Sequence, residues 1–275
     1  MPMTTAADER YTVPALQRGL ELLGCFSRQT PTLSGADLAR QLGVPRASVF
    51  RMLHTLEQTG FVERVGDSSH YRLGLGVLRL GFEYLASMEL TEHGRPVIEA
   101  LRDQTGYSAH LVVRDGREVV FVAKAPGRSA MFQSIQVGAR LPAHATVLGR
   151  LLLAGLSLAD LNALYPDAAL PVYTARTPGS VAALKALIDA DHAAGYSISQ
   201  GGFETGISTL AAPVYNDQAE VVAAVSITVP AQQLSDAQVA QLLPLVRAAA
   251  AQLTQRLSHL PTRGKQPAFA EPLTA

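Results

Sequence analysis

Two short helical patterns joined at a glycine constrain this chain more than any other feature. The first, LSGADLARQLG, begins at Ser34 and Asp37, which are spaced as a capping box, and stops at Gly43. The second spans residues 45–60, and Pro45 suits its first helical position. Its apolar positions share one face and are Val49, Leu53 and Leu56. Two short helices with a tight turn between them are typical of a helix-turn-helix.

The opposite face of the second helix lacks the alternating charges of a solvated surface. It carries Arg46, Ser48, Phe50, Arg51 and His54. The whole chain has zero net charge, but between Arg10 and Leu80 nine arginines stand against five acidic residues, a net charge of +4, and no lysine precedes Lys124. Guanidinium groups make paired hydrogen bonds to guanine and to phosphate. This face therefore favours DNA over plain solvent, although the charge is modest.

The segment FVERVGDSSHYRLGL follows Gly60 and contains two short alternating runs around turn residues 66–69. This pattern predicts a β-hairpin, the wing of a winged helix. We therefore expect a DNA-binding domain over residues 10–75 and a linker helix over residues 76–89. A lone winged helix reads few base pairs, so we expect at least a homodimer. The candidate dimer faces are the apolar stripes Leu16–Phe26 and Val77–Leu85.

From Tyr107 the pattern changes to strands mixed with helices. SAHLVVRDGREVVFVAKA predicts a hairpin with Asp115 and Gly116 at its turn. Further strands are predicted over 196–199, 207–215 and 220–229, and helices over 157–165, 180–194 and 236–259. Such a mixture indicates an α+β sheet with helices packed against it. We assign residues 90–260 to this second domain and residues 261–275 to a disordered tail.

The composition excludes several classes of protein. Apolar residues make up 48% of the 275 residues, which is enough for a sizeable core. Cys25 is the single cysteine, so no internal disulfide can form and a reducing cytoplasm is the expected location. No apolar run approaches the roughly 20 residues that cross a bilayer, and the N-terminus lacks a signal-peptide pattern. We expect a cytoplasmic protein with no membrane partner.

The motifs of common enzymes are missing from the sequence. There is no C-x-x-C, H-E-x-x-H, G-x-S-x-G or P-loop pattern, and LGLGVLRLG has Arg79 where a dinucleotide-binding loop needs its third glycine. One acid–base set is conceivable, His144 near Glu204 and Ser226. A histidine in such a loop is more often held structurally, so we assign no catalytic residue. We likewise expect no metal and no cofactor.

A loop that leads into an apolar helix, LPAHATVLG, predicts a binding site. Thr146 is a suitable N-cap, and the first N–H groups of the helix after it have no partner within the helix. Together with the helix dipole they favour an anion such as a carboxylate. The segment therefore predicts a site for a small organic acid.

Four segments, in this order and at this spacing, resemble the IclR family of bacterial transcriptional regulators. They are VPALQRGLELL, LARQLGVPRASVFRMLHTLEQTGFV, VGARLPAHATVLGRLLLA, and ETGISTLAAPV with VVAAVSITVP. The resemblance covers roughly Val13 to Leu260, and the third segment is most similar to members that regulate catabolism of aromatic acids. It implies a winged helix-turn-helix, a linker helix and an effector-binding domain related to the GAF fold. It also implies a homodimer or homotetramer.

The resemblance implies that the helix after Pro45 enters the major groove of double-stranded operator DNA. The predicted DNA-binding residues are Arg46, Ala47, Ser48, Phe50, Arg51, His54, Arg64 and Arg72, the last two on the wing. Arginine can read guanine, and serine or histidine can bond base edges or phosphates. For Phe50, packing against the wing is an equal alternative. For His54, a solvated or structural role is an equal alternative to a DNA contact.

The resemblance also places the loop before Thr146 beside the ETGIS segment and the last strand. The predicted effector-binding residues are Leu141, Ala143, His144, Thr146, Val147, Leu148, Glu204, Ile207, Thr209, Ser226 and Thr228. Hydroxyl groups among them can donate hydrogen bonds, while the aliphatic side chains hold an apolar body. For any one hydroxyl, local bonding within its strand is an equal alternative.

We therefore expect a DNA-binding regulator that responds to a small organic acid, of the aromatic or short keto class. Two other functions are compatible with the same segments. In the first, the second domain is an enzyme acting on a small acid, and the first domain targets it to DNA. In the second, the protein binds DNA constitutively and its pocket is vestigial.

Overall fold

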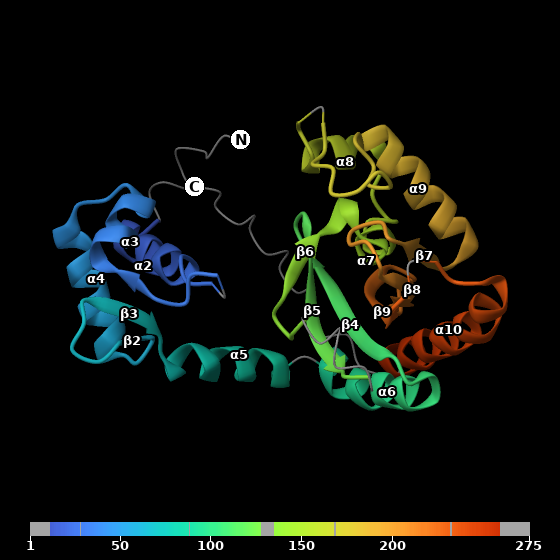
Figure 1. Cartoon of the computed structure of the whole chain (residues 1–275), viewed down its shortest axis with the longest axis horizontal. Helices are drawn as coiled ribbons and strands as arrows, with labels where there is room; N and C mark the ends of the chain where they lie inside the picture. Colours follow the sequence, from blue (N-terminus) through green and yellow to red (C-terminus); the bar gives the residue numbers. More distant parts are fainter. Residues whose placement is uncertain are drawn as a thin grey trace. The chain divides into compact units, whose positions relative to one another are not determined.

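The computed structural model describes residues 12–27, 29–87, 89–127, 135–167, 169–231 and 233–258 (Figure 1). The chain divides into two compact units, and the division falls between Ser87 and Met88. The tail predicted over residues 261–275 lies outside the described residues. No helix in the described part of the chain is both long enough and apolar enough to span a membrane.

The first unit is a winged helix-turn-helix. Its elements are α2 (Pro14–Gly24), β1 (Leu33–Ser34), α3 (Gly35–Leu42), α4 (Arg46–Gln58), β2 (Val62–Arg64), β3 (His70–Leu73) and α5 (Leu75–Ser87). The capping box predicted at Ser34 and Asp37 is confirmed, because each side chain bonds the other residue's backbone N–H. Gly43 follows α3 with φ 62°, a left-handed conformation that glycine adopts without strain.

Helix α4 begins one residue later than predicted. Pro45 is its N-cap and not its first helical residue, because a ψ of 141° keeps Pro45 extended. The Pro45 carbonyl still accepts hydrogen bonds from the N–H groups of Ser48 and Val49, at 2.9 and 3.2 Å. Pro45 therefore precedes the first helical residue, and its carbonyl accepts the first hydrogen bonds of α4.

The core of the first unit confirms the predicted apolar face of α4. Val49 and Leu53 are buried at 0% and 1% exposure, and Leu56 packs against them. On α2, Leu22 is buried in this core, while Leu16 and Leu20, in the stripe predicted as a candidate dimer face, are 62% and 61% exposed. Val49, Leu53 and Leu22 share this core with the buried residues Phe26, Leu33, Leu38, Ala39, Val62 and Tyr71.

The predicted wing is confirmed as the antiparallel hairpin of β2 and β3, with Val62 opposite Leu73 and Arg64 opposite Tyr71. A third strand, β1, pairs with β3 and was not predicted. With only two residues, it carries no alternating pattern that could identify it.

The second unit is an α+β domain. It comprises α6 (Glu89–Thr105), β4 (Ser108–Asp115), β5 (Glu118–Ala125), β6 (Arg140–Pro142), the 3-10 turn η2 (Ala143–Ala145), α7 (Val147–Leu152), α8 (Leu158–Leu164), α9 (Val181–Ala194), β7 (Ser197–Gln200), β8 (Ser208–Tyr215), β9 (Val221–Val229) and α10 (Asp236–Ser258). The predicted caps are confirmed, since Ser157 and Ser180 accept backbone N–H groups at the starts of α8 and α9.

Its six-stranded sheet is antiparallel throughout, in the order β6-β5-β4-β9-β8-β7. Helices α6 and α10 cover one face, and α7 lies on the other face with α8 and α9 outside it (Figure 1). The predicted fold class is thereby confirmed. Because neighbouring residues of a strand point to opposite faces, each strand contributes one set of side chains beneath α6 and α10 and another beneath α7.

Candidate functional site

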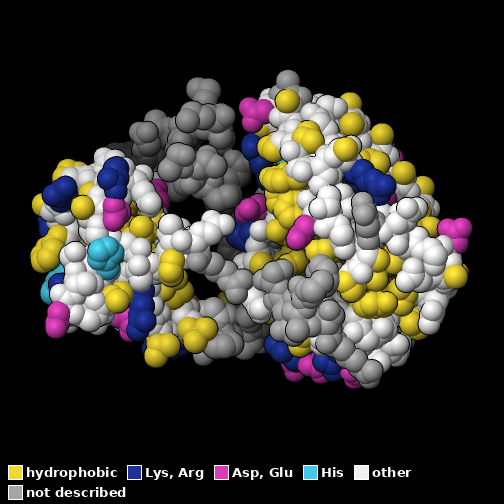
Figure 2. Space-filling view, viewed as in Figure 1, with side chains coloured by type: hydrophobic (Ala, Val, Ile, Leu, Met, Phe, Trp, Pro, Cys, Tyr) yellow, Lys and Arg dark blue, Asp and Glu magenta, His cyan; other side chains and the backbone are white. Residues whose placement is uncertain are grey.

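The outer face of α4 is open to solvent. Arg46, Ala47, Phe50, Arg51 and His54 are exposed, and Ser48 is half-buried. Phe50 is 63% exposed, so the alternative that it packs against the wing is wrong. Figure 2 shows basic side chains on the surface of this unit, and in the first unit every one of them is an arginine because the chain has no lysine before Lys124.

The arginines of α4 and those of the wing differ in their partners. Within the described part of the chain, the Arg46 and Arg51 guanidinium groups make no ion pair or hydrogen bond. Arg64 donates to the Tyr71 hydroxyl at 2.7 Å and lies over that ring. Arg72 pairs with Glu63 across the hairpin at 2.5 Å. Arg46 and Arg51 are therefore available to phosphates and bases without breaking another contact, whereas the wing arginines are not.

In the second unit, the loop LPAHATVLG folds around the start of α7. Thr146 caps α7 as predicted, and its Oγ1 accepts the Gly149 N–H at 3.1 Å. A side chain on Gly149 would collide with the Ala143 carbonyl, so glycine is needed for α7 to lie against η2. Because α7 has only six residues, its dipole is small. The predicted anion site at its first turn remains a prediction.

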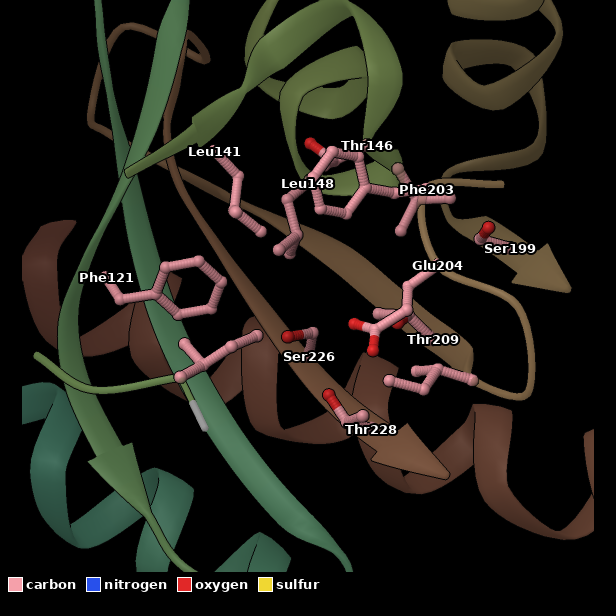
Figure 3. A pocket seen from close by; sticks show the side chains of 13 residues that line it. Phe121, Leu141, Thr146, Leu148, Ser199, Phe203, Glu204, Thr209, Ser226 and Thr228 are labelled. Carbon is pink, nitrogen blue, oxygen red and sulfur yellow. The ribbon is translucent and has the colours of Figure 1, made fainter. Parts of the chain in front are cut away.

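A cavity of about 60 Å³ lies between α7 and the sheet (Figure 3). Nine of the eleven residues predicted for the effector site line it: Leu141, Thr146, Val147, Leu148, Glu204, Ile207, Thr209, Ser226 and Thr228. Four lining residues were missed, namely Phe121, Ile135, Ser199 and Phe203. Phe203 directly precedes the ETGIS segment, so the same motif could have identified it. Phe121 reaches the cavity only through the pairing of β5 with β4, for which the sequence carries no local signal.

Ala143 and His144 were predicted in the same set, but they do not line the cavity. The tight turn of η2 buries Ala143 at 0% exposure beneath α7. His144 points to the other side, where its Nε2 bonds the Pro171 carbonyl at 2.9 Å. Its ring lies between Tyr165 and Tyr173, with centroids at 5.8 and 6.0 Å.

His144, Glu204 and Ser226 therefore do not form an acid–base set, because Glu204 and Ser226 line the cavity and His144 does not. Tyr165 beside it is no better as a proton carrier, since burial raises the pKa of its hydroxyl to about 12. Among the residues that the structure describes, no group of three or more His, Cys, Asp or Glu side chains could hold a metal.

The cavity lining combines hydroxyl groups with apolar side chains. Ser199, Thr209 and Thr228 stand in one row across β7, β8 and β9, and Ser226 lies two residues from Thr228. The apolar lining residues are Phe121, Ile135, Leu141, Val147, Leu148, Phe203 and Ile207. Glu204 is the one charged side chain among the described lining residues, and it points toward Ser226 and Thr209 (Figure 3). The cavity therefore suits a small molecule with one apolar face and one hydrogen-bonding edge.

A winged helix-turn-helix joined to a domain with a small-molecule cavity defines a transcriptional regulator with a sensory domain. The family models agree with this class. Residues 15–66 match the IclR helix-turn-helix domain, and residues 82–255 match the C-terminal domain of the bacterial transcriptional regulator IclR. The chain belongs to the IclR family, as the sequence motifs predicted. Because members of this family are transcriptional regulators, the prediction that the protein is not an enzyme is also confirmed.

Individual relatives extend over nearly the whole chain. The HTH-type transcriptional regulator XynR of Escherichia coli K12 is 29% identical over 250 residues, 90% of this chain and 98% of that protein. The crystal structure of a transcriptional regulator from Rhodococcus is 34% identical with a TM-score of 0.78, and the match covers 90% of this chain and 98% of that one. An IclR homolog from Microbacterium hydrocarbonoxydans, crystallised with 4-hydroxybenzoate, is 23% identical with a TM-score of 0.76, covering 88% and 98% of the two chains.

Proposed function

We propose that this regulator changes its affinity for operator DNA when a small organic acid, of the aromatic or short keto class, occupies the cavity beneath α7. The observation that carries the proposal is the convergence of three distant segments on one cavity: the loop into α7, the loop at Glu204 and strands β8 and β9. Apolar lining residues together with a row of hydroxyl groups fit the body and the polar edge of such a molecule. The 4-hydroxybenzoate complex of the Microbacterium relative supports the same class.

The acid group of the ligand is expected at the start of α7. The backbone N–H groups of Val147 and Leu148 precede the first bond of the helix ladder, so they have no helical partner. Glu204 repels a carboxylate and accepts hydrogen bonds, so it suits hydroxyl groups elsewhere on the ligand. The cavity is thus expected to receive the ligand in one orientation.

A thermal-shift assay tests the proposal. We expect benzoate, 4-hydroxybenzoate, pyruvate or 2-oxobutyrate to raise the melting temperature. A ligand at about 100 times its Kd stabilises the folded state by about 2.7 kcal/mol, which corresponds to roughly 5–10 °C in a domain of this size. Benzamide, the neutral amide of benzoate, should give a smaller shift. If every acid leaves both the melting temperature and DNA binding unchanged, the proposal is wrong and constitutive DNA binding is favoured.

We also propose that the first unit mediates self-association. It exposes an unusual number of large apolar side chains: Val13, Leu16, Leu20, Leu75, Leu78, Leu80 and Tyr84. The last four of these lie on α5. Exposed apolar clusters of this kind mark interfaces in soluble proteins. The side chain of Leu85, in the stripe predicted as a dimer face, lies outside the described residues.

Light scattering at micromolar concentration is expected to give two or four times the chain mass of 29.2 kDa. Placing lysine at both Leu16 and Leu20 should shift the population toward the monomer, because two charges would be desolvated in the interface. Leu158→Lys is the matched control, since Leu158 is 47% exposed on α8 in the second unit. A single species of 29.2 kDa that binds one palindromic site tightly would contradict the proposal.

A further inference from the structure

Several buried polar side chains of the second unit have an atom without a hydrogen-bond partner in the described part of the chain, and two of them, His110 and Ser226, face each other across the sheet. His110 on β4 is 2% exposed, and neither of its ring nitrogens has a hydrogen-bond partner in the described part of the chain. Ser226 on β9 is 0% exposed, and its Oγ also lacks a partner there. The two residues are directly opposite each other in the β4–β9 ladder. Side chains so paired lie on the same face of the sheet, with Cβ atoms about 5 Å apart.

This face is the one that forms the floor of the cavity. Ser226 and Phe121 both line the cavity (Figure 3). The His110 ring meets the Phe121 ring edge to face, with centroids 5.4 Å apart at 88°. The next residue, Leu111, points to the opposite face, where it lies against Gly94 of α6. His110 does not itself line the cavity, but it lies directly behind the floor, against the lining residues Ser226 and Phe121.

Unpartnered donors and acceptors are costly in such a place, because folding has removed the water that bonded them. An apolar residue at position 110 would avoid this cost and would still pack against Phe121. Polar groups that are buried without partners and lie at a cavity are suited to a ligand that supplies the missing bonds.

We propose that His110 and Ser226 form a subsite for an uncharged hydroxyl group of the ligand, which makes the ligand a hydroxylated small acid. The inference rests on the proposed function, since it specifies the class of acid bound in that cavity. The hydroxyl oxygen accepts from one side chain, and its hydrogen is donated to the other.

A hydroxyl fits this pair better than a carboxylate does. A neutral imidazole has one donor and one acceptor nitrogen, and a serine hydroxyl can act in either role. A carboxylate only accepts, so it would leave the acceptor nitrogen of His110 unsatisfied. Burial, followed by the charge of Lys124, lowers the pKa of His110 to about 4, so the ring is neutral at pH 7. The Lys124 ammonium donates to the Ile135 carbonyl at 2.6 Å.

Calorimetry on matched probes tests the subsite. The pairs are 4-hydroxybenzoate with benzoate, lactate with propionate, and phenol with benzene. In at least one pair, wild type should bind the hydroxylated member about tenfold more tightly. Ser226→Ala and His110→Phe should each remove most of that preference, because each lowers the affinity for the hydroxylated member more than the affinity for the other member. Thr91→Ala is the control, because Thr91 is also buried and unpartnered among the described residues but belongs to α6, which covers the face of the sheet opposite the cavity.

Nitrogen-15 NMR of histidine-labelled protein gives a second measurement that needs no variant. The hydroxylated probe should shift the His110 ring nitrogens, and its partner without the hydroxyl should not. Discrimination of phenol from benzene without binding of any acid would support the subsite and contradict the proposed acid effector. Equal affinity within every pair, or a preference that survives both variants, would overturn the subsite while leaving the effector proposal intact. Binding of no probe at all would overturn the subsite, and failure of pyruvate and 2-oxobutyrate as well would overturn the effector proposal.

Discussion

Replacing Arg150 with methionine is expected to lower the free energy of unfolding of the second unit by about 3 kcal/mol. Arg150 on α7 donates from Nε to Asp191 of α9 at 2.6 Å and from Nη2 to Ser197 of β7 at 2.9 Å. Ser197 in turn donates to Asp191 at 2.7 Å. The Arg150 and Asp191 side chains are only 10% and 16% exposed, so removal of the cation leaves a poorly hydrated carboxylate. Urea unfolding measures the loss.

Two variants separate this buried pair from ordinary charge effects. Combining Arg150→Met with Asp191→Leu removes both charges, so the double variant should be more stable than Arg150→Met alone. Lys185→Ala breaks an exposed ion pair with Asp189 on α9 and should change stability by less than about 1 kcal/mol. If Arg150→Met is as mild as Lys185→Ala, the network does not hold α7 in place. Because α7 carries Val147 and Leu148 of the cavity wall, the destabilised variant should also bind ligand more weakly.

Substituting alanine at both Arg46 and Arg51 is expected to weaken specific DNA binding at least about 30-fold, since each arginine that reads a base contributes about 1–3 kcal/mol. Both side chains are exposed on α4 without a partner in the described part of the chain. The measurement is fluorescence anisotropy at fixed salt, on a DNA fragment that wild type selects from a random-sequence pool. Discrimination against unrelated DNA should fall together with affinity, because base contacts specify sequence.

Arg40→Ala is the matched control for the DNA-binding experiment. Arg40 on α3 has a side chain that is 76% exposed and paired with Asp37, so its loss removes one charge without touching α4. We expect a small, sequence-independent decrease and a slightly shallower salt dependence. Wild-type affinity in the double variant at positions 46 and 51 would show that α4 does not read the operator.

Local chemistry explains why so much of the helical structure was predictable. The caps at Ser34, Ser157 and Ser180 depend on residues within a few positions of each other, and the buried face of α4 follows from its 3.6-residue period. Local patterns alone do not decide which apolar residue is buried. In α2 both Leu20 and Leu22 are apolar, and the packing of the other helices buries Leu22 and leaves Leu20 exposed.

The cavity was partly predictable for a different reason. The motifs around Thr146 and Glu204 indicated which segments converge, so residues inside those motifs were found. Phe121 and Ile135 lie outside them. His144 lies inside one, yet the η2 turn directs its side chain toward Pro171 and away from the cavity. Membership of a motif therefore did not determine where a side chain points.

By itself, the sequence determined the order of the elements, the helix caps, the arginine-rich face of α4 and the family. Those features depend on neighbours in the chain or on motifs of a few residues. Only the tertiary structure decided that His110 stands opposite Ser226 and that Phe121 closes the cavity beside them. Pairing of β4 with β9 joins residues more than a hundred positions apart, and its register is set by ladder hydrogen bonds and by which face of each strand is buried. No short stretch of sequence contains that information.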